Sequence, residues 1–440
     1  MWFLRLNMTD RSYTVEEAPE RYKKLGGRGL TSTLICDEVD PTCHPLGPNN
    51  KVVIAPGLFA GTIAPTSSRV SVGTKSPLTG GIKEANAGSS WAPNMARMQL
   101  KAIIVEGMPE EEDKFWTARI SLEGGKPKVE FMPADEYVGR DLYEVFPEVY
   151  ERFGKKIDIA GIGTAGEFKY GNSGIVFPDM KQRPSRYSGR GGVGAVMGSK
   201  GLKFIVLDST DAPGVQYADK ELFKEGAKKM RDALGEHAVT KPQGGLNSYG
   251  TAILVNILNE AGGLPTRNFR SGHFDGAAKI AGEAIFESNK KVMGKEVYNH
   301  ACSPGCVIQC SNTLYDEQGN ELVSCIEYES DWSFGADCGI DDLKAIAEMV
   351  RLCNAYGLDT IEAGVTMGVA MDSGLLPFGD AEGVIKLLHE MGKGTPTGRL
   401  LGSGAAAVAK VFGNPRSPTR SEERRVGKEC GPRWSPEHQK

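Results

Sequence analysis

The segment HACSPGCVIQCSNTLYDEQGNELVSCIEYESDWSFGAD, His300–Asp337, carries the densest group of reactive side chains in the sequence. Cys302, Cys306 and Cys310 follow one another at an even spacing of four. Pro304-Gly305 interrupts any helix between the first two, so the sulfur atoms can converge from different directions. Three thiols this close, in a chain without a secretion signal, favour a metal or iron–sulfur site.

Two other interpretations of these cysteines stay open from the residues alone. Cysteines four apart on one helix are also typical of small buried hydrophobes, and zinc accepts thiolates as readily as iron does. A site with three thiolates needs a fourth ligand. Cys325, Cys338 and Cys353 are the candidates, and their spacing selects none of them.

Composition narrows the class of protein. The chain has 440 residues, 40% of them hydrophobic and 25% charged, which is ordinary for a globular protein of two to three domains. A net charge of −4 argues against binding to nucleic acid or a membrane surface, and no apolar run is long enough to span a bilayer. The N-terminus resembles a strand and turn rather than a signal peptide, so with nine cysteines we expect a reducing, cytoplasmic location.

The first 210 residues are predicted to be rich in β-structure, because short apolar runs alternate with glycine turns. We expect strands at 1–10, 52–55, 101–106 and 156–160, a hairpin over 117–131, and helices at 16–24 and 141–153. The run Thr62–Gly88 is small, hydroxylated and glycine-rich, with Arg69, Lys75 and Lys83. Such a run presents N–H groups and cations to a phosphate, or else forms a set of plain hairpin loops.

Two stretches match the pattern G-x-G-x-x-G, at Gly161–Gly166 and Gly189–Gly194. A dinucleotide-binding fold needs a strand, a glycine turn, a helix and an acidic residue about 20 positions later. The first match is not followed by a helical sequence, and the second lacks the acidic strand end. A nicotinamide dehydrogenase is therefore the weakest of the enzyme hypotheses, although these glycines, with Arg190 beside them, could still hold another phosphate.

From residue 211 to residue 413 the sequence is mostly helical in its periodicity. The predicted helices are 219–234, 250–260, 277–292, 341–356, 360–373, 381–391 and 398–412. Residues 414–440 are basic, contain prolines and show no period, which is typical of a disordered tail. We therefore predict an α+β fold with a β-rich domain at 1–210, a mostly α-helical domain at 211–413 and an unrelated tail at 414–440, in which Cys430 is not a ligand.

Several motifs in order make residues 1 to about 412 resemble the tungsten- or molybdenum-containing aldehyde ferredoxin oxidoreductases. The motifs are GGRGL at Gly26, TSSR to TKSPLTG at Thr66–Gly80, AN-x-G at Ala85, GTAGE at Gly163, GRGG-x-GAVMGSK at Gly189, YGT at Tyr249, GGLPTRNFRSGHF at Gly262, the cysteines, EYES at Glu327 and GLDTI at Gly357. Each motif alone is weak, and their common order is what carries the resemblance.

The resemblance implies a fold, a set of cofactors and a reaction. Members of the family hold one tungsten or molybdenum through the dithiolenes of two pterins (molybdopterin), beside one [4Fe–4S] cluster and a Mg²⁺ that bridges the pterin phosphates. They oxidise an aldehyde to a carboxylate with water and pass two electrons to ferredoxin. The N-terminal domain is a β-rich base under the pterins, helical domains cover it, and a homodimer is the expected assembly.

The resemblance also assigns roles to residues of this chain. Arg69 and Arg190 are implied to face the pterin phosphates, and Asn86 and Gly191 to lie near the Mg²⁺. The flanking motif glycines Gly88 and Gly192 belong to the same cradles. The pterin motif Asp-x-x-Gly-Leu-Asp is present as Asn354, Gly357 and Asp359 with an asparagine in first place. Cys302, Cys306 and Cys310 are the implied cluster ligands, and Glu327 and Glu329 the implied catalytic carboxylates, which as bases could take a proton from water.

The sequence departs from the family pattern after Phe412. The fourth cluster cysteine and an active-site histidine of the family lie in a C-terminal helical domain that has no counterpart here. We therefore hypothesise a truncated or chimeric chain whose open helical domain exposes apolar surface. The rival class is a truncated inactive homologue, or a metal-stabilised electron-transfer module without catalytic activity.

Overall fold

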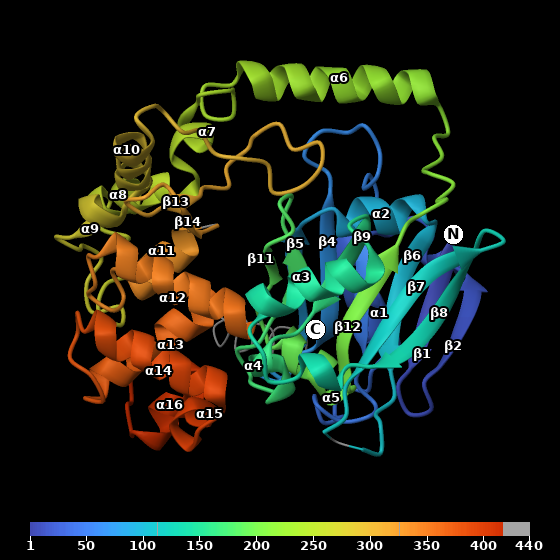
Figure 1. Cartoon of the computed structure of the whole chain (residues 1–440), viewed down its shortest axis with the longest axis horizontal. Coiled ribbons are helices and arrows are strands. Elements are labelled where there is room, and N and C mark those ends of the chain that lie inside the picture. The colour runs from blue at the N-terminus through green and yellow to red at the C-terminus, as the bar shows by residue number, and fades with distance from the viewer. Residues whose placement is uncertain (112, 325, 417–440) are drawn as a thin grey trace, which may run out of the picture.

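The computed structural model describes residues 1–111, 113–324 and 326–416, and Figure 1 shows two parts side by side. Strands dominate the N-terminal part on the right of the view, and helices dominate the C-terminal part on the left. The predicted α+β class, β-rich first and helical second, is confirmed. The predicted boundary near residue 210 falls between the last strand of the second sheet, which ends at Asp208, and a long helix that begins at Lys220.

The first sheet has six strands in the order β2-β1-β6-β3-β4-β5. Their bounds are β1 Trp2–Asn7, β2 Ser12–Glu17, β3 Val52–Pro56, β4 Arg69–Lys75, β5 Ile82–Gly88 and β6 Leu100–Glu106. Strands β4 and β5 form a hairpin at the edge, with Arg69 opposite Gly88 and Ser71 opposite Asn86. Helices α1 (Gly27–Glu38) and α2 (Trp91–Arg97) contact this sheet. Most of the glycine-rich run thus forms an ordered hairpin, and its binding to phosphate stays a prediction.

The second sheet also has six strands, in the order β11-β10-β9-β12-β7-β8. Their bounds are β7 Trp116–Glu123, β8 Lys126–Pro133, β9 Ile157–Gly161, β10 Ile175–Pro178, β11 Pro184–Ser188 and β12 Leu202–Asp208, with helices α3 Leu142–Phe153, α4 Thr164–Glu167 and α5 Val193–Ser199. Strand β9 runs antiparallel to both of its neighbours. A parallel β-α-β unit is therefore missing at the first G-x-G-x-x-G, as far as the described residues show, so this match does not support the nicotinamide hypothesis.

The C-terminal part packs helices around a second apolar core. The helices are α6 Lys220–Glu236, α7 Gly245–Tyr249, α8 Leu254–Glu260, α9 Ala277–Ile280, α10 Gly282–Met293, α11 Tyr328–Phe334, α12 Leu343–Tyr356, α13 Thr360–Asp372, α14 Ala381–Lys393, α15 Pro396–Gly402 and α16 Ala405–Val411. A short hairpin, β13 Leu314–Tyr315 with β14 Glu321–Val323, follows the cysteine segment. Asp359 and Asp342 accept hydrogen bonds from backbone N–H groups at the starts of α13 and α12.

Helix α6 crosses the top of Figure 1 and links the two parts. Among the seventeen described residues of this helix, only Ala227 is buried. Isolated helices of this length are marginal in water, because most helical stability in proteins comes from packing of an apolar face. The aromatic side chain of Phe223 packs edge-on against Phe59 and Tyr217, which attaches the start of α6 to the N-terminal part.

Three expected helices differ from the structure. Residues 16–24 do not form one helix, because Glu16 and Glu17 pair with β1, and only Glu20–Tyr22 forms a 3-10 turn. The expected helix 277–292 breaks at Ala281, where the backbone is extended. The expected helix 398–412 breaks at Gly404, whose φ of +92° lies outside the helical region.

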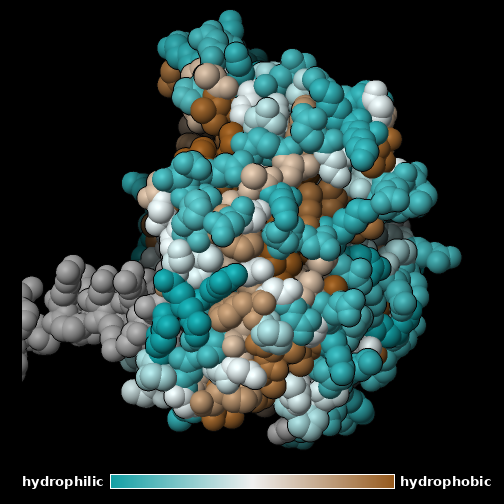
Figure 2. All heavy atoms as spheres, turned by 90° about the vertical axis from the view of Figure 1, so that its left-hand side faces the viewer, coloured by the Kyte–Doolittle hydropathy of each residue, from teal (hydrophilic) through white to brown (hydrophobic). Residues whose placement is uncertain are grey.

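The helical part exposes apolar side chains among polar ones. Figure 2 shows its outer face, on which apolar areas lie between hydrophilic residues. Ile257, Val411 and Phe412 are exposed by 54%, 64% and 41%. Among the described helices, none has both the length and the apolarity needed to cross a membrane.

Candidate active site

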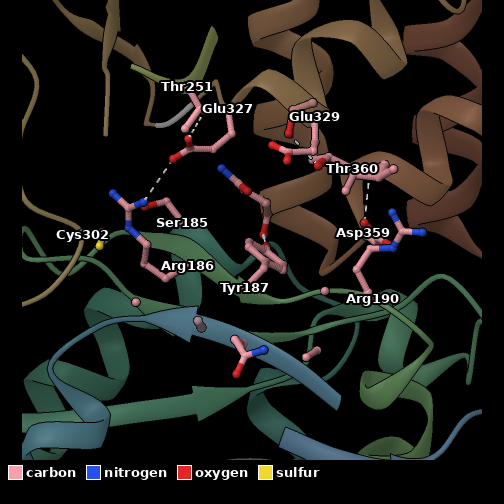
Figure 3. A pocket seen from close by; sticks show the side chains of 18 of the residues that line it. Ser185, Arg186, Tyr187, Arg190, Thr251, Cys302, Glu327, Glu329, Asp359 and Thr360 are labelled. Atoms are coloured by element: carbon pink, nitrogen blue, oxygen red, sulfur yellow. Dashed lines mark hydrogen bonds and ion pairs between the residues drawn. The ribbon is translucent and has the colours of Figure 1, made fainter. Parts of the chain in front are cut away.

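A cavity of about 560 Å³ lies between the two parts of the chain. Strands β5 and β11 and the loop at Gly189 form its lower side, and the starts of α11 and α13 form its upper side. Figure 3 shows Glu327 and Glu329 on the upper side, with Arg186 below Glu327 and Arg190 beside Asp359. The predicted residues that line it are Arg69, Asn86, Gly88, Arg190, Cys302, Cys310, Glu327, Glu329, Asn354 and Asp359.

The β4–β5 hairpin brings the first group of predicted residues to the cavity. The Asn86 side chain is held on both sides, because Ser71 donates to its Oδ1 at 2.5 Å and its Nδ2 donates to Glu84 at 2.6 Å. Gly88 lies against the cysteine segment: a Cβ at this position would stand 2.9 Å from Cys302 Sγ. The edge of the first sheet therefore touches the predicted cluster loop directly.

The loop before α5 supplies the second group. The Arg190 guanidinium lies 3.3 Å from the Asp359 carboxylate, so residues more than 150 positions apart in sequence meet here. Gly191 and Gly192 have φ values of +82° and +74°. Their missing side chains leave room for Lys83 and Pro77, and the Gly191 carbonyl accepts a hydrogen bond from Ser76 at 2.8 Å. Both glycines shape the loop next to the cavity wall.

The turn from Asn354 to Asp359 is docked on the N-terminal part through its backbone. The N–H of Gly174 donates to the Gly357 carbonyl at 2.9 Å, and the N–H of Asp359 donates to the Asn172 carbonyl at 2.8 Å. A Cβ on Gly163, in the GTAGE motif, would lie 2.3 Å from the Tyr356 carbonyl oxygen. The GTAGE and GLDTI motifs are therefore two sides of one close contact, which orients Asp359 toward the cavity.

Glu327 and Glu329 stand at the start of α11. Thr251 donates a hydrogen bond to Glu327 Oε2 at 2.6 Å, and Arg186 Nη1 lies 3.8 Å from Glu327 Oε1. On the side of Glu329, the hydroxyls of Ser330 and Thr360 are hydrogen-bonded at 2.7 Å and join α11 to α13. The two glutamates thus enter the same cavity in different polar surroundings.

The three cysteines gather at one end of the cavity. Cys302 and Cys306 are buried, and Cys310 is half-buried. The hydrogen bond that the Cys302 thiol donates to Cys306 raises the pKa of Cys302 and lowers the pKa of Cys306 to about 6. Burial, together with the nearby charge of Glu327, raises the pKa of Cys310 to about 11. In the residues that the structure describes, no three His, Cys, Asp or Glu side chains converge closely enough to hold a single metal ion.

The candidates for a fourth ligand are not equivalent. Cys338 is fully buried in the helical core and donates to the carbonyls of Ser333 and Gly364. Cys353 is also fully buried, and burial raises the pKa of both thiols well above the usual value. Both therefore behave as core side chains. Cys325 lies outside the described residues.

Arg28, Arg186 and Thr251 are among the cavity residues that were not predicted as site residues. Arg28 and Thr251 lie within the GGRGL and YGT motifs, so the motifs were the available signal. Arg186 lies on β11 with a side-chain exposure of 6%. A buried arginine on a strand gives no sequence signal, because its partner Glu327 is 141 residues away.

Comparison with known proteins gives matches along nearly the whole chain. The family model described as the N-terminal domain of aldehyde ferredoxin oxidoreductase matches residues 3–209, and the model for domains 2 and 3 of the same family matches residues 225–423. The tungsten-containing aldehyde ferredoxin oxidoreductases of Pyrococcus furiosus and Thermococcus kodakarensis are 35% and 36% identical over 431 residues. Each of these alignments covers 94% of this chain and 67% of the relative.

Two more distant similarities also cover most of the chain. The aliphatic sulfonate oxidoreductase, WOR-like subunit, of Pyrococcus furiosus is 24% identical over 420 residues, which are 90% of this chain and 64% of that protein. The solved active-site complex BamBC of benzoyl coenzyme A reductase aligns with a TM-score of 0.75 at 22% identity, over 94% of this chain and 63% of the other. The chain thus spans about two thirds of the length of the proteins it matches. On the two family models and the identity to the two tungsten-containing enzymes, this chain belongs to the aldehyde ferredoxin oxidoreductase family.

Proposed function

We propose that this protein oxidises an aldehyde to a carboxylate with water, at a tungsten or molybdenum bis-pterin centre bound in the cavity, and passes the electrons through a [4Fe–4S] cluster to ferredoxin. The observation that carries the proposal is the convergence of cations, carboxylates and thiols on one cavity of about 560 Å³. Aldehyde and water give a carboxylate, three protons and two electrons. Such a reaction needs a centre that accepts the two electrons, a base that accepts protons and a route by which the electrons leave. The metal site, the two glutamates and the cysteine cluster are the proposed candidates for these three roles.

The donor set of the cavity fits a group with several phosphates. Arg28, Arg69, Lys83 and Arg190 all line it, and guanidinium groups bind phosphate oxygens in pairs. Gly189 lines the cavity, and Gly191 and Gly192 let the loop pack closely against Lys83 and Pro77. We propose that Arg69 and Arg190 hold pterin phosphates, with Asn86, Gly88, Gly191 and Gly192 forming the adjacent Mg²⁺ and phosphate cradle. The metal and its dithiolenes, when bound, supply the two-electron chemistry.

The motif Asn354, Gly357 and Asp359 is proposed to face the pterin rings. Asp359 reaches the cavity with Arg190 at its carboxylate, and Asn354 is fixed by a hydrogen bond from its Nδ2 to the Tyr143 hydroxyl at 3.2 Å. Gly357 has φ of +78°, a left-handed conformation that favours glycine and that forms the turn between Asn354 and Asp359. Carboxylate and amide groups pair well with the N–H and C=O edges of a pterin.

The cysteine segment lies at the end of the cavity and can supply thiolates to a cluster. A four-iron cluster binds each of its thiolates at a different iron, and three thiols on one short segment supply three such ligands. Cys302 and Cys310 reach the cavity wall, and Cys306 contacts Cys302. We propose these three as ligands of a [4Fe–4S] cluster beside the metal centre, which would give the electrons a short way out.

Glu327 and Glu329 are proposed as the catalytic carboxylates. A carboxylate that faces the cavity can accept a proton from water while the oxygen bonds to the carbonyl carbon. The lining of the cavity also includes Val350, Leu358 and Ile361, which are suitable for the apolar part of an aldehyde. Ferredoxin as the acceptor, a homodimeric assembly and a cytoplasmic location remain predictions that accompany this proposal.

Anaerobic purification of the full chain, followed by metal analysis and aldehyde assays, tests the proposal. We expect tungsten or molybdenum, iron and sulfide in the protein, and reduction of a viologen dye that depends on acetaldehyde or benzaldehyde. Glu327→Gln should retain the metals and lose at least about 100-fold in kcat, since positioned bases contribute factors of this size. Iron without tungsten or molybdenum would favour an electron-transfer module, and zinc alone or no metal would refute the proposal.

A further inference from the structure

The carboxylate of Glu327 is held from two sides by residues outside its own helix. Thr251 Oγ1 lies 2.6 Å from Oε2, and Arg186 Nη1 lies 3.8 Å from Oε1. Thr251 comes from the 3-10 turn Thr251–Ile253 of the helical part, and Arg186 comes from β11 of the N-terminal part. Figure 3 shows the three side chains next to one another, on the side of the cavity where Cys302 lies.

The hydrogen bond from Thr251 to Glu327 has a fixed direction. The backbone N–H of Tyr328 donates to Thr251 Oγ1 at 3.0 Å. Because that hydroxyl oxygen already accepts one hydrogen bond, its own proton is available for Glu327 Oε2. The first N–H of helix α11 is thereby linked through one hydroxyl to the carboxylate.

The backbone conformation of Gly250 brings Thr251 next to Glu327. Gly250 has φ of +66° and ψ of −166°, a combination essentially restricted to glycine. A Cβ on Gly250 would stand 3.0 Å from the Cys310 carbonyl oxygen. The YGT motif therefore lets Thr251 approach Glu327 while its neighbour packs against the cysteine segment.

Arg186 is positioned on the other side by burial and by a second partner. Its Nη2 lies 3.4 Å from His300 Nε2, and its register on β11 places it opposite Phe177 of β10. A guanidinium with 6% side-chain exposure loses most of its hydration, and the facing Glu327 carboxylate offsets part of that cost. Arg186 and Glu327 thus orient each other across the boundary between the two parts.

We propose that Thr251 and Arg186 are positioning residues that fix the Glu327 carboxylate in the orientation in which it accepts a proton from water. The inference rests on the proposed function. Glu327 takes one of the three protons released, the water oxygen bonds to the carbonyl carbon, and the two electrons leave to the dye or carrier. Neither residue contacts the reacting atoms, and each acts through Glu327.

The test compares Thr251→Val, which removes the hydroxyl at nearly constant volume, with Thr251→Ser, which keeps it. Thr33→Val is the matched control, because the Thr33 hydroxyl donates its hydrogen bond to the Gly29 carbonyl within its own helix, α1. The infrared carboxylate bands of Glu327 are assigned by their loss in Glu327→Gln, in the protein as isolated. Arg186→Lys adds a variant that keeps the charge but has one nitrogen for two partners.

We expect Thr251→Val to shift the Glu327 bands and to lower kcat by about 10- to 100-fold, since misplacement by about 1 Å costs factors of this size. KM should change by less than about twofold, because the hydroxyl does not face the substrate. Thr251→Ser should restore both the bands and kcat, and Thr33→Val should behave as the wild type.

Two results would overturn the inference. Unshifted Glu327 bands in Thr251→Val would show that the hydroxyl does not hold the carboxylate, whether or not the protein is active. Shifted bands with an unchanged kcat, in a protein that oxidises aldehydes, would show that the orientation is irrelevant to the reaction. A wild type that loads its metals and oxidises no aldehyde would instead refute the proposed function, and the infrared comparison would still decide whether Thr251 and Arg186 hold Glu327.

Discussion

Gly88 is the position at which the first sheet meets the predicted cluster loop, and Gly88→Ala should disturb that contact. The new Cβ would lie 2.9 Å from Cys302 Sγ, 3.1 Å from its Cβ and 3.2 Å from its carbonyl oxygen. Ordinary carbon contacts need about 3.5–4.0 Å, so the cysteine segment must retreat by roughly 0.5–1 Å. Overpacking of this kind costs about 1–3 kcal/mol, or a few degrees in Tm.

The measurement is iron and sulfide per chain in anaerobically purified wild type and variant, with Tm recorded on the same samples. We expect the iron content of Gly88→Ala to fall below about half, because displacement of one ligand weakens a cluster more than it weakens the fold. Gly81→Ala in the same hairpin is the control, since its added Cβ meets only Thr79 Oγ1, at 3.8 Å. A full iron complement in Gly88→Ala, with the visible spectrum of the wild type, would contradict the assignment of Cys302 as a ligand.

Three further changes test the packing that supports the site. Gly163→Ala should lower Tm by several degrees and reduce pterin content, because its Cβ would lie 2.3 Å from the rigid Tyr356 carbonyl oxygen, and an unchanged Tm would exclude that contact. Burial raises the pKa of Asp337 to about 7 from 3.8, so the folded chain keeps a proton that the unfolded chain releases, and stability should fall by about 4 kcal/mol as pH rises from about 4 to 7. In Asp337→Asn the midpoint of urea unfolding should depend less on pH across that range. A pH dependence equal to that of the wild type would contradict this explanation. Lys203→Met leaves the buried Glu167 carboxylate without its cation and should cost about 3–5 kcal/mol in urea unfolding, whereas adding Glu167→Gln should recover most of the loss.

The parts of the site that could be predicted from sequence are those that require a particular residue type at a particular local spacing. Glycines with positive φ at Gly191 and Gly357, and cysteines at close spacing, leave a local pattern because no other residue type serves. The same holds for the β7–β8 hairpin and for α12, whose apolar spacing is strong over their whole length. These features need no knowledge of what lies opposite them.

The parts that could not be predicted depend on contacts across long stretches of sequence. Glu16 and Glu17 favour a helix locally, but pairing with β1 draws them into a strand. Ala281 interrupts a helical pattern because Gly282 packs against the Tyr249 carbonyl, 33 residues earlier. Arg186 becomes a site residue only through Glu327 and the fold that joins them. Local propensity cannot report such pairs, since tertiary packing overrides it.

The sparse packing of α6 has a consequence for how the two halves stay together. This helix is the covalent connection between the β-rich and helical parts, yet Ala227 is the only buried residue among those described in it. The halves are joined instead by backbone hydrogen bonds at Gly174 and Asp359 and by the close contact of Gly163 with Tyr356. A protease that cut α6 would therefore leave two fragments that remain associated as one particle, with the cavity intact. In its construction the site is closer to the interface of a heterodimer than to a cleft within one domain.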